Sequence, residues 1–115
     1  MSTPLALLDL IARLEAAPEG GLELSEAIAR WFSHNHYEWW RKRSGPSNFT
    51  ESLDAARTLV PANAGWQAGA DHNGGQATAE LAWQRKRGEA ILSIEVSAST
   101  PALALCIACL RVRQQ

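Results

Sequence analysis

The sequence predicts an α+β fold, in which an antiparallel meander of three to four strands is packed against helices on its faces as a layered α/β sandwich. Apolar residues recur at helical spacing before residue 61 and after residue 101, whereas between residues 65 and 97 they alternate with polar ones. Asn73-Gly74 and Arg87-Gly88 interrupt this alternation, as tight turns between antiparallel strands do. The length of 115 residues predicts a single domain, 1–115.

The first third of the chain is predicted to form two helices. Thr3 and Pro4 have the pattern of a helix start, a hydroxyl N-cap followed by proline, and Pro18 ends this helix near Ala17. A second, shorter helix follows Gly21. The apolar stripes of the two helices are Leu7, Leu10, Ile11 and Leu14, then Leu24, Ile28 and Phe32.

The middle of the chain is predicted to contain a turn, a strand and a third helix. His34-Asn35-His36 has the composition of a turn, and Tyr37–Arg43 has the aromatic richness of a strand, which would extend the sheet. After a loop at residues 44–48, Thr50 is predicted to cap a helix that Pro61 stops.

The three strands of the meander should each direct one set of residues toward the core. These sets are Trp66, Ala68 and Ala70; Ala77, Ala79, Leu81 and Trp83; and Ala90, Leu92, Ile94 and Val96. Thr100-Pro101 then repeats the opening helix start, and no charged residue occurs from Ala102 to Leu110. A helix that is apolar all round needs cover on more than one side. The sheet should cover one side, and either another helix or a second copy of the chain the other, so we expect a homo-oligomer.

Composition excludes several classes of protein. The formal net charge of −1 argues against a dedicated nucleic-acid binder, whose domain is usually strongly basic. No apolar run reaches the roughly 18 residues that a membrane-spanning helix needs, and the N-terminus lacks the basic region of a secretory signal. We therefore expect a cytoplasmic protein without a membrane partner, in which Cys106 and Cys109 are reduced thiols.

The most distinctive stretch is Trp31–Arg43, which holds five of the eight aromatic residues. Its segment Trp39-Trp40-Arg41-Lys42-Arg43 is echoed by Trp83-Gln84-Arg85-Lys86-Arg87. If the two segments are neighbouring strands, their arginines would form a cationic cluster beside tryptophan rings, a combination that binds phosphates and bases. The predicted ligand-binding residues are Tyr37, Trp39, Trp40, Arg41, Arg43, Arg85 and Arg87. The alternative is that the cations protect strand edges while the tryptophans fill the core.

Metal binding and catalysis have weaker support in the sequence. Cys106 and Cys109 lie inside an apolar helix rather than in the turn that a zinc knuckle requires. The three histidines, His34, His36 and His72, have no spacing that defines a metal site or a triad, and no phosphate-binding or nucleophile motif is present. We therefore expect no enzyme activity, no metal and no cofactor.

Two segments resemble a known family. Phe-Thr-Glu-Ser-Leu-Asp-Ala-Ala-Arg at 49–57 and Ser-Thr-Pro-Ala-Leu-Ala-Leu-Cys at 99–106 are similar to helix starts of the phage ABA sandwich domain, a group of small phage and prophage proteins. The resemblance covers residues 49–113 and implies a layered α/β fold and a phage protein acting in the cytoplasm of its host cell. It carries over no catalytic or ligand-binding residue.

These observations lead to two functional hypotheses. The first is a non-enzymatic phage protein that binds a small anionic ligand, with a sponge for the cyclic nucleotide signals of host immunity as the specific form. This form rests on analogy with small oligomeric anti-defence proteins of phages. The second is a protein–protein interaction module whose Trp31–Arg43 surface binds a host or phage protein, because Trp, Tyr and Arg are enriched in binding hot spots.

Overall fold

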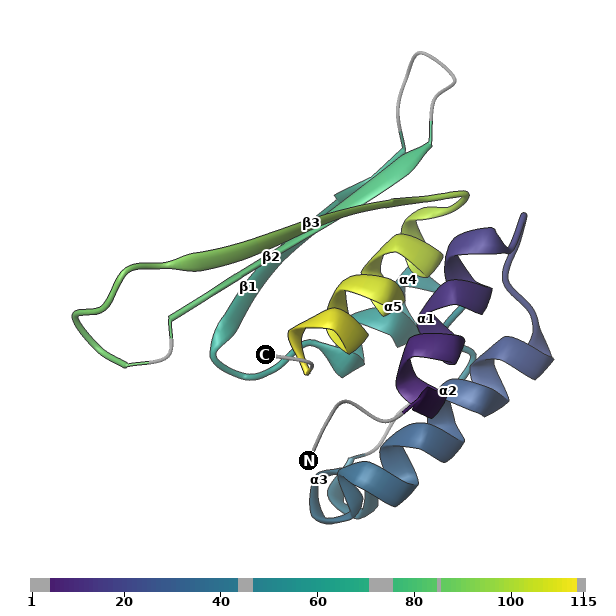
Figure 1. Ribbon diagram of the computed structural model, residues 1–115, viewed down its shortest axis with the longest axis horizontal. Helices are drawn as coiled ribbons and strands as arrows, with labels where there is room; N and C mark the ends of the chain where they lie inside the picture. The colour runs from purple at the N-terminus through teal and green to yellow at the C-terminus, as the bar shows by residue number, and fades with distance from the viewer. Residues whose placement is uncertain (1–4, 44–46, 71–75, 85, 114–115) are drawn as a thin grey trace.

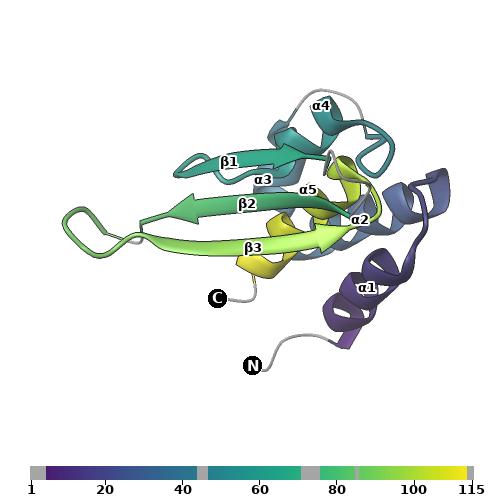
Figure 2. The same ribbon diagram turned by 90° about the horizontal axis from the view of Figure 1, so that it is seen from above.

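The computed structural model of the protein describes residues 5–43, 47–70, 76–84 and 86–113. Its antiparallel sheet has the order β1-β2-β3, and the helices gather on one face of this sheet (Figures 1 and 2). The strands are β1 (Ala64–Gly69), β2 (Ala77–Trp83) and β3 (Leu92–Ala98). The helices are α1 (Leu5–Ala16), α2 (Leu22–Asn35), α3 (Tyr37–Lys42), α4 (Leu53–Ala56) with the 3-10 turn η1 (Arg57–Leu59), and α5 (Pro101–Val112). The α+β prediction, with its three-stranded meander, is confirmed.

The register and burial confirm the predicted core-facing residues of β2, and Leu92, Ile94 and Val96 of β3 lie on the same face. Trp66 of β1 lies opposite Leu81 but is 38% exposed, and Ala70 and Ala90 are exposed outside the strands, so these expected core positions are wrong. Leu81 lies opposite Ile94 on the face that carries the helices, and Glu80 lies opposite Glu95 on the open face. The burial of β2 alternates accordingly, with Ala77, Ala79, Leu81 and Trp83 all buried. Because the open face is polar, it needs no covering layer. The β1–β2 turn predicted at Asn73-Gly74 lies outside the described residues, whereas Gly88 has the positive φ of 90° that a tight turn requires.

Helix α5 is the centre of the core. Nine successive residues, from Ala102 to Leu110, are buried. The sheet covers one side of α5, and α1 and α4 cover the other, so the chain itself supplies both layers (Figure 1). Thr100 caps the helix as predicted, with its Oγ1 accepting from the backbone N–H of Leu103 at 3.1 Å. The argument that α5 needs a second copy of the chain therefore does not hold, and homo-oligomerisation stays a prediction.

The predicted strand at Tyr37–Arg43 is wrong, because Tyr37–Lys42 forms helix α3. Helix α2 continues through His34 and Asn35, and the break falls at His36 alone, with φ −138°. The carbonyl of His36 accepts from the N–H of Trp40 at 2.8 Å, which is a helical bond. Aromatic richness favours a strand only where the rings pack on a sheet, whereas here they pack on α2. No fourth strand is present among the described residues.

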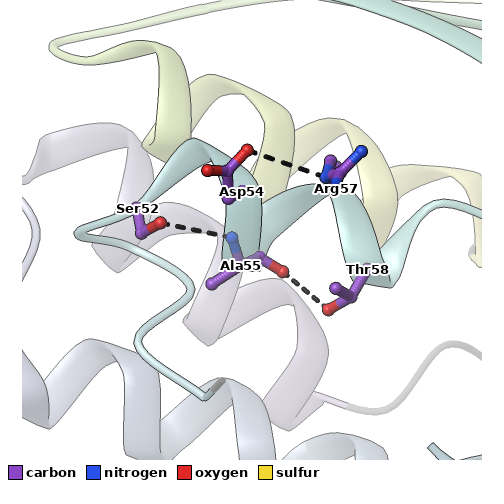
Figure 3. Close-up of polar contacts among 5 residues, drawn as sticks. All are labelled: Ser52, Asp54, Ala55, Arg57 and Thr58. Atoms are coloured by element: carbon purple, nitrogen blue, oxygen red, sulfur yellow. Dashed lines mark hydrogen bonds and ion pairs between the residues drawn. The ribbon is translucent and has the colours of Figure 1, made fainter. Parts of the chain in front are cut away.

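Ser52, rather than Thr50, caps α4 (Figure 3). Its Oγ accepts from the N–H of Ala55 at 3.3 Å, and the Thr58 hydroxyl donates to the Ala55 carbonyl at 2.6 Å. An exposed ion pair between Asp54 and Arg57 spans the same turn at 3.7 Å.

Thr50 instead joins the α1–α2 connection to the start of α4. Its Oγ1 lies 2.8 Å from Ser25 Oγ, accepts from the N–H of Gly21 at 2.9 Å and donates to the Gly21 carbonyl at 3.0 Å. The backbone of Gly20 approaches that of Thr50 so closely that a Cβ at Gly20 would lie 1.8 Å from the Thr50 carbonyl oxygen. This connection fixes the position of α2, which carries the aromatic stretch.

Candidate functional site

A cluster of aromatic rings joins α2 to α3. Phe32 is fully buried at its centre, with ring centroids 5.1 Å from Trp31 and 5.3 Å from Trp39. Trp40 extends the cluster into the core, where its ring lies 6.1 Å from that of Phe49. The aromatic richness of the Trp31–Arg43 stretch therefore serves largely to anchor α3 on α2.

Arg43 closes one side of this cluster. Its guanidinium lies 4.9 Å from the ring centroid of Trp40 and 5.0 Å from that of Phe49. Its Nη2 donates to Thr58 Oγ1 at 2.9 Å, so it also ties α3 to η1. These contacts hold the guanidinium within the chain.

Arg113, at the end of α5, lies over the other side of the cluster. Its guanidinium is 4.9 Å from the ring centroid of Phe32 and 5.7 Å from that of Trp39, and its Nη1 donates to the Cys109 carbonyl at 2.9 Å. Burial lowers the pKa of Arg113 from its ordinary value. Within the described part of the chain, no carboxylate pairs with it. A partly buried cation without a counter-ion favours the binding of an anion.

A pocket of about 560 Å³ opens beside Arg113. Small-molecule sites commonly have about 300–1,000 Å³. The pocket is formed by the end of α5, the start of α3, the connection between η1 and β1, and the end of β2. Its lining residues are His36, Trp39, Pro61, Ala62, Asn63, Trp83, Val112 and Arg113. Arg113 is the one permanent charge among the described residues of this lining.

The pocket brings together one tryptophan from each of the two similar segments, Trp39 and Trp83. The predicted pairing of the two segments as strands is wrong, because α3 lies beside α2 and, among the described elements, beside no strand. The described basic residues that follow the two tryptophans, at 41–43 and 86–87, do not line the pocket with them. Among the described residues, the segments therefore meet through Trp39 and Trp83 and not through their arginines.

None of the other predicted ligand-binding residues that the structure describes lines this pocket. Tyr37 is 60% exposed on α3, and Arg41 is exposed and paired with Glu38 at 3.2 Å. Arg87 is exposed in the connection between β2 and β3. Arg85 lies outside the described residues. Of the seven predicted residues, Trp39 lines the pocket, while Trp40 and Arg43 belong to the packed cluster behind it.

His36 forms the wall of the pocket at the break between α2 and α3. Its ring lies 5.2 Å from that of Trp31 and 5.8 Å from that of Phe32. Burial, and then the charge of Arg113, lower the pKa of His36 below its ordinary value, so the ring is neutral at neutral pH. No hydrogen bond joins its ring nitrogens to another described residue.

Sequence reasoning did not identify Arg113 or Asn63 as pocket residues, and it considered His36 only for metal or catalysis. Arg113 follows the charge-free segment of α5 in the sequence, at the position where a helix end leaves the core. A cation there commonly interacts with the last carbonyls of the helix, as Arg113 does. Nothing in the local sequence shows that this helix end lies beside α3.

The two cysteines are core residues. Burial raises the pKa of Cys106 well above its ordinary value and that of Cys109 to about 12, so both remain thiols. The Cys106 thiol donates to the Phe49 carbonyl at 3.3 Å. The described residues contain no cluster of side chains suited to holding a metal ion.

Comparison with known proteins provides no relative: no protein-family model, no curated protein and no solved structure matches this chain. The resemblance to the phage ABA sandwich domain therefore stays a prediction. Among the described residues, no helix is long and apolar enough to cross a membrane.

Proposed function

We propose that the protein is a non-enzymatic binding protein for a small anionic ligand that has a flat aromatic part. The anionic group would bind at Arg113, and the flat part would pack on Trp39 and Trp83. The observation that carries the proposal is that Arg113, without a carboxylate partner in the described chain, borders a pocket with two tryptophans in its lining.

The energies of these contacts suit a specific ligand. A hydrogen bond to a charged group contributes about 1.5–3 kcal/mol, and stacking of a base on an aromatic side chain contributes about 1–3 kcal/mol. Arg113 is held by the Cys109 carbonyl and by the ring of Phe32, so little side-chain freedom is lost on binding. Asn63, also in the lining, has an amide that can donate to or accept from polar atoms of the ligand.

Cyclic nucleotides combine an aromatic base with a phosphate, and we propose them as the first ligands to examine. In the specific form of the hypothesis, the protein is a phage anti-defence sponge that assembles as a homo-oligomer in the host cytoplasm and sequesters cyclic nucleotide immune signals. The chemistry of the pocket supports the binding of a base and a phosphate. The phage origin depends on the resemblance of residues 49–113 to the phage family.

Thermal unfolding with a panel of cyclic and linear nucleotides tests this function. A ligand present at a thousandfold excess over its dissociation constant should stabilise the fold by about 4 kcal/mol. Native mass spectrometry of the purified protein should show the ligand intact and the number of subunits. A panel without any shift contradicts the proposal, and recovery of hydrolysed ligand would indicate an enzyme. A steep loss of binding with salt, without preference for mononucleotides, would indicate single-stranded nucleic acid.

A second candidate function is protein–protein interaction through α3. Tyr37 and Arg41 are four residues apart on this helix, and both are exposed, Tyr37 to 60%. Tyrosine and arginine at the centre of an interface often dominate its binding energy. Tyr37→Ala should then weaken capture of a host or phage protein and leave small-ligand binding unchanged. Leu22, which is 68% exposed at the other end of α2, provides the matched control Leu22→Ala.

A further inference from the structure

We propose that His36 is a second anion-binding residue of the pocket, whose protonated ring donates a hydrogen bond to the acid group that Arg113 binds. This inference rests on the proposed function. It predicts that the pocket binds ligands whose acid group accepts hydrogen bonds from two donors, such as a phosphate diester or a sulfonate.

His36 and Arg113 line the same pocket, although one ends α2 and the other ends α5. The backbone of His36 is fixed, because its N–H donates to Phe32 and its carbonyl accepts from Trp40, each at 2.8 Å. The ring nitrogens have no hydrogen-bond partner among the described residues. A ring nitrogen of His36 is therefore free to form a hydrogen bond with a ligand in the pocket.

The charges around His36 also favour this role. From α5, the charged group that faces it is Arg113, and the neutral thiol of Cys109 lies behind this guanidinium. The lining residues from the η1–β1 connection and from β2 have no titratable group, and neither do the rings of α2 and α3 that pack on His36. Because none of these neighbouring residues has a carboxylate, an anionic ligand would be the group that stabilises a protonated His36.

The affinity of the pocket for an anion should depend on pH. In the free protein, burial and Arg113 keep the pKa of His36 low, so the ring is neutral at neutral pH. An anion between the two residues favours the protonated ring and raises this pKa in the complex. Binding therefore takes up a proton, and affinity increases as the pH falls from the bound pKa toward the free pKa. The increase is at most about tenfold per pH unit, since one proton is involved.

Calorimetric titration with naphthalene sulfonate and with cyclic AMP tests the inference, because neither acid group titrates between about pH 5.5 and 8.5. We expect binding to be about three- to tenfold tighter at pH 5.5 than at pH 8, with uptake of a fraction of a proton seen by comparing buffers of different ionisation enthalpy. Binding without pH dependence or proton uptake overturns the role of His36 and leaves the proposed function intact. Failure of both probes to bind overturns both.

Two matched variants assign the effect to one ring. His36→Gln keeps a hydrogen-bonding side chain that cannot titrate, so binding should persist while its pH dependence disappears. His34→Gln is the control, because His34 is exposed on α2 and lies in a different hollow, beside Arg30 and Trp31. A pH dependence that survives in His36→Gln or disappears in His34→Gln contradicts the inference. If a variant does not fold, the proton uptake measured on the unmodified protein still tests whether a group of the pocket is protonated on binding.

Discussion

Arg43 and Arg113 lie on the same aromatic cluster but are placed for different tasks. Each guanidinium is 4.9 Å from a ring centroid, over Trp40 in one case and Phe32 in the other. Arg43 also donates to Thr58, which closes the gap between α3 and η1. Arg113 donates to a carbonyl of its own helix, and its other side borders the pocket.

Residue type and ring stacking do not tell which of the two arginines borders the pocket. Both side chains have a pKa lowered by burial, so neither burial nor stacking separates them. The difference lies in the second contact, since Arg43 donates to Thr58 on η1, whereas Arg113 lines the pocket. Substitutions at the two positions should therefore affect different measurements.

The largest effect is expected for ligand affinity in Arg113→Gln. Loss of a charged hydrogen-bond donor of about 1.5–3 kcal/mol should weaken binding of naphthalene sulfonate by about ten- to a hundredfold in calorimetry. Arg113→Lys keeps the charge but not the planar fork, and should recover part of this loss. An unchanged dissociation constant in Arg113→Gln would mean that the anion binds elsewhere.

Arg43→Gln should instead reduce stability. The variant loses the cation–π contacts with Trp40 and Phe49 and the hydrogen bond to Thr58. Its free energy of unfolding in urea should therefore be lower by about 1–2 kcal/mol. The dissociation constant for naphthalene sulfonate should stay within about twofold. A loss of affinity as large as that in Arg113→Gln would remove the distinction between the two residues.

Thr58→Val tests the hydrogen bond between Arg43 and Thr58. The substitution removes the acceptor for Arg43 and the donor to Ala55, and should lower the free energy of unfolding by about 1 kcal/mol. Thr78→Val is the control, because Thr78 is exposed on β2, where valine is also favourable. If both variants have equal stability, Thr58 does not hold Arg43 in solution.

The smallest effects are expected for the exposed arginines of the two similar segments. Arg41→Gln breaks an exposed ion pair with Glu38, and Arg87→Gln removes an exposed cation. Each should change the free energy of unfolding by less than about 0.5 kcal/mol and leave the dissociation constant unchanged. A clear loss of affinity in Arg87→Gln would restore the anion site that the sequence predicts at the second segment.

The sequence was sufficient for the framework because its signals there are local. Alternation along β2 identified Leu81 and Trp83 as core residues, and Thr100 capped α5 as expected. The charge-free helix was recognised as one that needs two covering layers. Whether the second layer is α1 with α4 or another chain depends on long-range packing, which local patterns do not encode.

The candidate site was harder to predict because it depends on tertiary contacts. Tyr37–Lys42 is helical because its tryptophans pack on Phe32, and this neighbour overrides the strand preference of aromatic residues. The structure places Arg41 on α3 and Arg43 at the C-terminal end of this helix, rather than on the strand that the sequence predicts. Arg113 reaches Trp39 from the far end of the chain, a contact without a local signature.

The most direct measurement of the difference between the two arginines is nuclear magnetic resonance of their Nε–H groups during titration with naphthalene sulfonate. The account predicts that the Arg113 signal shifts with ligand concentration and saturates with the calorimetric dissociation constant, while the Arg43 signal stays in place. Movement of the Arg43 or Arg87 signal with an unmoved Arg113 signal would contradict it.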